Sequence, residues 1–102
     1  MDCEAVLREL TEDIVRLLSP EKIILFNQKQ NTHGELTAIK LCVVIPQGDA
    51  RRAERRLYME LESALPLDLL VYNRGEWQGL LDTPYSFAGR IRQTGRVLYE
   101  AD

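Results

Sequence analysis

The stretch that decides the fold is residues 36–45, which read Leu36-Thr37-Ala38-Ile39-Lys40-Leu41-Cys42-Val43-Val44-Ile45. Its branched and apolar side chains recur at alternate positions, Ile39, Leu41, Val43 and Ile45. Successive side chains of a β-strand point to opposite faces, so this alternation predicts a strand with one fully apolar face. The other face carries Ala38, Lys40, Cys42 and Val44 and is therefore mixed in character.

The segments on either side of this strand show helical and strand periodicity, separated by turn residues. Asp2 and Asp49 are the predicted N-caps of the first two helices, and Gly95 is the predicted C-cap of the last. The expected elements are a helix over 3–18, a strand over 22–26, a polar loop over 27–35, the strand over 36–45, a helix over about 50–64, a strand over 67–72, one or two helical turns that include Trp77, a helix over 85–94 and a strand over 97–99.

This order predicts a single α/β (α+β) domain over residues 1–102. We expect a small mixed sheet of three or four strands, with the helices packed on one face. Trp77 is predicted to be a core anchor or cleft wall, with nucleotide stacking as the alternative. Cys42 lies in an apolar run and is predicted to be a small core residue.

Charge and composition exclude several classes of function. The chain has a net charge of −3, with 45% hydrophobic and 28% charged residues, which is ordinary globular composition. An acidic chain is a poor general binder of nucleic acid or anionic membranes. No apolar run approaches the length of a membrane span, and the N-terminus lacks the pattern of a secretory signal, so a cytoplasmic protein is expected. Cys3 and Cys42 have no metal-ligand spacing.

Four segments carry a family resemblance, and they cover most of the chain. They are Ile23-Ile24-Leu25-Phe26 followed by Asn27-Gln28, the strand from Ala38 to Val44, the strand Leu67-Asp68-Leu69-Leu70-Val71, and the ending Gly95-Arg96-Val97-Leu98-Tyr99. In this order they resemble the minimal nucleotidyltransferases of the DNA polymerase β superfamily. Members of that family have Gly-Ser after the first strand, Asp-x-Asp in the second strand and one further Asp in the third.

The resemblance also shows what this chain lacks. Nucleotidyl transfer needs Mg²⁺ ions held by carboxylates and by the substrate phosphates. Ala38 and Lys40 stand at the Asp-x-Asp positions, Asn27 and Gln28 stand at Gly-Ser, and Asp68 alone matches. These five are predicted to be vestigial active-site positions. We therefore expect no catalytic residue, no metal and no cofactor, and a non-enzymatic binding or regulatory module.

Two questions about this site stay open in the sequence. One alternative is an active transferase that binds Mg²⁺ and a nucleoside triphosphate through Glu35 and Asp68. The strand parity opposes it, because Glu35 would face away from Lys40 in a regular strand. The other question is whether Lys40 pairs with Asp68 in place of a metal, or whether each is solvated separately.

A protein partner is implied by the resemblance. Small nucleotidyltransferase-like proteins are similar to the antitoxin members of toxin–antitoxin modules, whose partners are HEPN-domain proteins. The predicted partner surface consists of Cys42, Leu70 and Tyr72, on the face that carries Lys40. A homodimer through this face is equally compatible with the sequence.

Four arginines form a basic cluster on the second predicted helix: Arg51, Arg52, Arg55 and Arg56. Such a cluster can bind RNA or an acidic partner. It can also be a solvated helix face balanced by the nearby Glu54, Glu60 and Glu62. The negative net charge of the chain and the lack of interleaved aromatic residues favour the solvated face. Binding of nucleic acid is therefore the least favoured of the functions considered.

Overall fold

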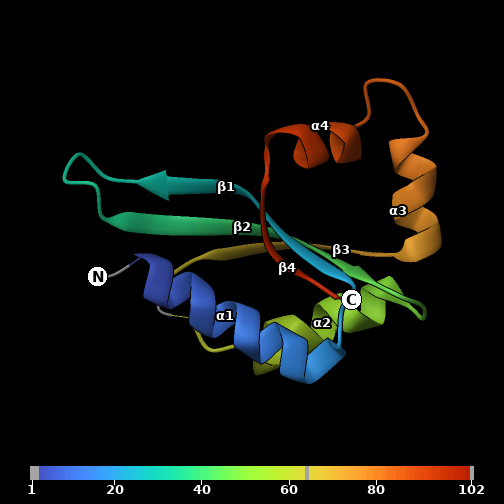
Figure 1. Ribbon diagram of the computed structural model, residues 1–102. Helices are drawn as coiled ribbons and strands as arrows, with labels where there is room; N and C mark the ends of the chain where they lie inside the picture. Colours follow the sequence, from blue (N-terminus) through green and yellow to red (C-terminus); the bar gives the residue numbers. More distant parts are fainter. Residues whose placement is uncertain (1–2, 64, 102) are drawn as a thin grey trace.

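Helices and strands are interspersed along the chain in a computed structural model that describes residues 3–63 and 65–101 (Figure 1). The predicted N-cap Asp2 and position 64, the predicted helix end, lie outside these residues. The elements are α1 (Cys3–Leu18), β1 (Lys22–Gln30), β2 (Leu36–Ile45), α2 (Ala50–Glu60), β3 (Leu67–Asn73), α3 (Arg74–Leu81), α4 (Phe87–Thr94) and β4 (Arg96–Glu100).

The predicted order of elements is confirmed, and α1 and β2 have the predicted bounds. The main difference is β1, which continues to Gln30 through residues that were expected to form a loop. Pairing with β2 supplies the hydrogen bonds that make this polar stretch extended. α2 ends at Glu60, earlier than expected, and Asp49 caps its start as predicted. α3 begins at Arg74 because Asn73 and Glu76 form a capping box.

The four strands form one mixed sheet in the order β3-β2-β1-β4. β1 pairs antiparallel with both β2 and β4, whereas β2 and β3 are parallel. The register of β1 against β2 shifts between Leu25 and Asn27. Phe26 is the extra residue of this β-bulge, so Asn27 lies directly opposite Lys40.

The lower face of the sheet in Figure 1 carries the main core, against α1 and α2. The alternating residues of β2 face this side, as predicted from their spacing. The buried side chains are Leu7, Leu10 and Ile14 of α1, Leu57 of α2, and Ile23, Leu25, Ile39, Leu41, Val43, Leu69 and Val71 of the sheet.

The opposite face is also covered, so the expectation of helices on one face only is wrong. α3 and α4 place Trp77, Ala88 and Ile91 over Ile24, Cys42 and Val44. The physical reason is that β2 becomes apolar on both faces from Cys42 onward, and a strand buried on both sides needs two layers. In Figure 1 the loop end of the β1–β2 hairpin extends away from α3 and α4.

Among residues 3–63 and 65–101, no helix combines the length and the apolar character that crossing a membrane requires.

Candidate functional site

The candidate site is a row of three side chains across three adjacent strands. Asn27 of β1 lies opposite Lys40 of β2, and Lys40 lies opposite Asp68 of β3. Antiparallel and parallel pairing thus place three of the five positions that the resemblance singled out side by side. Ala38 is two residues from Lys40 on the same strand and therefore shares its face.

Lys40 and Asp68 form an ion pair. The Nζ atom of Lys40 lies 3.6 Å from Oδ2 of Asp68, with 31% of the Lys40 side chain and 69% of the Asp68 side chain exposed. The pairing predicted as one of two alternatives is therefore confirmed. Exposed pairs of this kind contribute only about 0–1 kcal/mol to stability, so its importance is its position rather than its strength.

The residues of this site do not fit a magnesium ion. Mg²⁺ requires several hard oxygen ligands in near-octahedral geometry. Ala38 supplies no ligand, Lys40 places a positive charge in the site, and the carboxylate of Asp68 already faces that charge. Within the described part of the chain, no three His, Cys, Asp or Glu residues are grouped so that they could hold a metal.

Glu35, the second carboxylate of the alternative metal site, is held in the hairpin turn. Its backbone N–H donates to Oδ1 of Asn31 at 3.0 Å, and its carboxylate accepts from Nδ2 of Asn31 at 3.4 Å. Glu35 precedes β2, five positions from Lys40, which corresponds to about 16 Å along an extended chain. The fold therefore does not bring Glu35 to Asp68.

Asn27 and Gln28 are exposed strand residues and not a phosphate loop. Gln28 lies opposite Ile39 in the ladder with β2. A Gly-Ser loop would direct free backbone N–H groups at phosphate oxygens. Here the backbone is extended and paired, so these two positions form no phosphate cradle.

The partner surface predicted from sequence needs correction at Cys42. This residue is fully buried, in the cluster that α3 and α4 form with the sheet, because those helices cover its end of the face. Leu70 and Tyr72 are partly buried, and Tyr72 packs on Trp77 with ring centroids 5.9 Å apart. Trp77 is thus a core anchor, as one of the two interpretations predicted.

The sequence reasoning missed an aromatic pair on this side of the sheet. Phe87 of α4 is 51% exposed, and its ring contacts Phe26 edge-on at a centroid distance of 5.7 Å. The signal was the position of Phe26 two residues after Ile24, which places both on the face that α4 covers, but the partner ring of Phe87 lies far along the chain. Phe26 packs with Leu70 and Tyr72 around the same cluster of buried residues.

Burial raises the pKa of the Cys42 thiol to about 12. The thiolate is the reactive form, so Cys42 is expected to resist alkylation at neutral pH in the native protein. A Cys3→Ser variant leaves Cys42 as the single thiol. We expect no labelling of this variant by iodoacetamide in buffer and complete labelling in urea. Rapid labelling in buffer, measured by mass spectrometry, would contradict the buried position.

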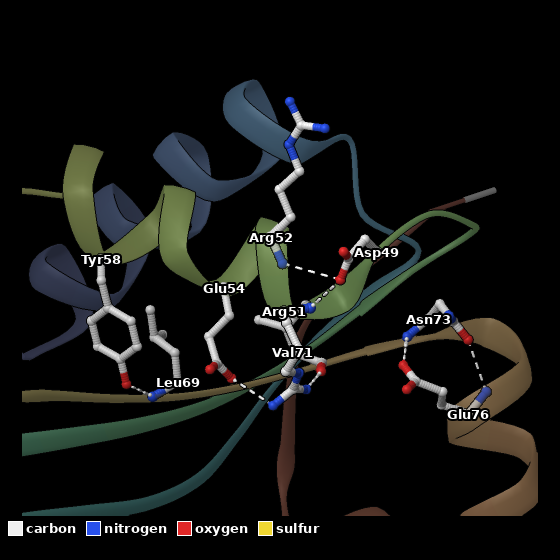
Figure 2. Close-up of polar contacts among 9 residues, drawn as sticks. All are labelled: Asp49, Arg51, Arg52, Glu54, Tyr58, Leu69, Val71, Asn73 and Glu76. Carbon is white, nitrogen blue, oxygen red and sulfur yellow. Dashed lines mark hydrogen bonds and ion pairs between the residues drawn. The ribbon is translucent and has the colours of Figure 1, made fainter.

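The basic cluster of α2 does not form one free surface. Arg51 contacts Glu54 at 3.5 Å and donates to the carbonyl of Val71, while Arg56 donates to Glu60 at 2.8 Å. Figure 2 shows the guanidinium of Arg52 pointing away from β3, in the direction opposite to Arg51. Half of the cluster is therefore engaged within the chain, in agreement with the favoured interpretation of a balanced, solvated face.

Comparison with known proteins adds no relative: no family model, no curated protein and no solved structure matches this chain.

Proposed function

We propose that this chain is a nucleotidyltransferase-like domain that has lost nucleotidyl transfer and serves as a binding or regulatory module. The observation that carries the proposal is the Lys40–Asp68 ion pair. It lies at the positions where the resemblance places two of the metal-binding carboxylates. A fixed ammonium group there repels a divalent cation and neutralises the remaining carboxylate.

The strand register supports this proposal. The parallel pairing of β2 and β3 sets Lys40 and Asp68 directly opposite each other. In an enzyme of the resembled family, this arrangement would direct carboxylates from two strands at one metal site. This register is the one that such a site would need, while Ala38 and Lys40 stand where two of its three carboxylates would be. An active enzyme that uses Glu35 is disfavoured, because that residue is held by Asn31 in the hairpin turn.

The partner in this proposal is a protein, of the HEPN type that the resemblance implies, and a second copy of the chain is the alternative. The half-exposed Phe87 offers an aromatic contact over Phe26, the residue that precedes Asn27 of the candidate site. Aromatic side chains are enriched at the centre of protein interfaces. Nucleic acid is disfavoured because the chain is acidic and half of its basic cluster forms internal contacts.

The proposal is tested by thermal-shift titration with Mg²⁺ and each nucleoside triphosphate. We expect no metal-dependent shift for the natural chain. A ligand at about 100 times its Kd stabilises by about 2.7 kcal/mol. For a domain of this size, each kcal/mol raises the melting temperature by about 4–8 °C. A metal-dependent shift of the natural chain would contradict the proposal and favour a transferase.

A matched pair of variants tests the position of the vestigial site. In Ala38→Asp/Lys40→Asp, three carboxylates should face one another, and we expect Mg²⁺ to raise the melting temperature. Adding Asp68→Asn to the same variant should remove most of the rise in melting temperature that Mg²⁺ causes. Absence of any Mg²⁺ effect in the first variant would argue against the assignment of positions 38, 40 and 68 to an ancestral metal site.

A further inference from the structure

The outer edge of β3 is a place where this sheet could be extended. β3 stands at the end of the strand order, and within residues 3–63 and 65–101 its single neighbouring strand is β2. Alternate residues of an edge strand direct their backbone N–H and C=O groups away from the sheet. In β3 these include Leu69 and Val71, within the apolar sequence Leu67-Asp68-Leu69-Leu70-Val71-Tyr72. A long apolar edge of this kind is prone to pair with another strand.

Two side chains of α2 occupy backbone groups on this edge (Figure 2). The N–H of Leu69 donates to the hydroxyl of Tyr58 at 2.8 Å. The guanidinium of Arg51 donates to the carbonyl of Val71, and Glu54 holds the same guanidinium at 3.5 Å. Tyr58 and Arg51 thus cover one donor and one acceptor that are two residues apart on β3.

These two groups are among those that a second copy of the chain would need in order to pair with β3. Consider two β3 strands pairing antiparallel about a two-fold axis at Leu70. The N–H of Leu69 in each copy then donates to the carbonyl of Val71 in the other copy. The two-fold axis generates each of these hydrogen bonds twice, once from each copy to the other. Tyr58 and Arg51 therefore compete directly with self-pairing.

We infer that Tyr58 and Arg51 form an edge lock that prevents a second copy of this chain from adding to the sheet at β3. The exposure of these side chains supports this role. Tyr58 is 50% exposed, so its ring contributes less to the core than a buried aromatic residue would. This inference rests on the contacts of α2 with β3 and is independent of the proposed function.

The other edge of the sheet is protected by different means. β4 has five residues, and its register against β1 shifts between Ile23 and Ile24. Arg96 at its start forms a two-armed contact with Glu4, at 2.7 and 2.8 Å. Short length, a bulge and a charged side chain each discourage strand addition. β3 has seven residues, and its pairing with β2 shows no shift in register, so it depends on the two side chains of α2.

The test compares a double variant with a control that changes the same residue types elsewhere. In Tyr58→Phe/Arg51→Met, the ring and the aliphatic stem remain while the hydrogen-bonding groups are lost. Tyr85→Phe/Arg52→Met makes the same chemical changes at two exposed residues, and Figure 2 shows Arg52 pointing away from β3. Self-association is measured by sedimentation velocity over a wide range of concentration. Circular dichroism checks that all proteins are folded.

We expect the natural chain and the control to sediment alike. The dissociation constant for self-association of Tyr58→Phe/Arg51→Met should be lower than that of the natural chain by roughly tenfold or more. In that dimer the amide of Val71 should become protected from hydrogen exchange. The inference would be overturned if the folded double variant associates no more strongly than the control, or if it dimerises without protection of Val71. If the double variant fails to fold, the same comparison is made with Tyr58→Phe against Tyr85→Phe.

Discussion

A Gly95→Ala variant is expected to lose about 3 kcal/mol of stability, at the upper end of overpacking effects. A methyl group on Gly95 would lie 2.5 Å from Cγ2 of Ile24 and 2.6 Å from the carbonyl oxygen of Ile91. Ile24 is buried, and the carbonyl of Ile91 belongs to the backbone of the last turn of α4, so neither contact can be relieved without moving the helix end. Urea denaturation followed by circular dichroism measures the loss.

This expectation differs from the usual reason for glycine at a helix end. Gly95 ends α4 as predicted, and its N–H donates to the carbonyl of Ile91 at 2.7 Å. Its φ of −78° is available to any residue, so the requirement is for space and not for a left-handed conformation.

The control for this variant is Gly79→Ala in α3. No atom lies within 4 Å of a methyl group at Gly79. The substitution should therefore stabilise the protein by about 0.4–1 kcal/mol through helix propensity and the entropy of the unfolded chain. Equal stability of Gly95→Ala and the natural chain would show that α4 does not approach β1 as closely as described.

A Trp77→Ala variant is expected to lose about 3–5 kcal/mol. Trp77 is 7% exposed and is the large aromatic anchor of α3 on the sheet. It packs on Tyr72 and belongs to the buried cluster that contains Cys42 and Val44. Removing the indole leaves a cavity between α3 and the sheet, where few other side chains of α3 are buried.

Urea denaturation followed by far-ultraviolet circular dichroism measures this loss, because the variant has no tryptophan fluorescence. Trp77→Phe is the matched control, and its free energy of unfolding should fall clearly less, since it keeps an aromatic ring in the cluster. In the Cys3→Ser background, Trp77→Ala should also make Cys42 accessible to iodoacetamide. A stable variant whose Cys42 stays protected would contradict the role of Trp77 in holding α3 on the sheet.

Much of the local structure follows from the sequence alone. The alternation in residues 36–45 sets β2 and its core face, and the stripe of apolar residues in 3–18 sets α1 with the observed bounds. Asp49 is the N-cap of α2, and its side chain accepts hydrogen bonds from the backbone N–H groups of Arg51 and Arg52. These features depend on neighbours along the chain, which is why periodicity and capping residues predict them.

The candidate site is determined only in part by sequence. The pairing of Lys40 with Asp68 was one of two open alternatives, and the register of β2 with β3 decided it. The extension of β1 through Asn27 and Gln28 was not predicted, because polar residues become a strand only when a partner strand is present.

The sequence by itself determined the order of elements, the core face of β2 and the absence of the Asp-x-Asp carboxylates. The tertiary structure alone decided three other features: the cover of α3 and α4 over Cys42, the bulge at Phe26, and the contacts of Tyr58 and Arg51 with β3. Each of these joins segments far apart in the chain. Their geometry depends on how whole layers pack, and no local pattern of residues records that.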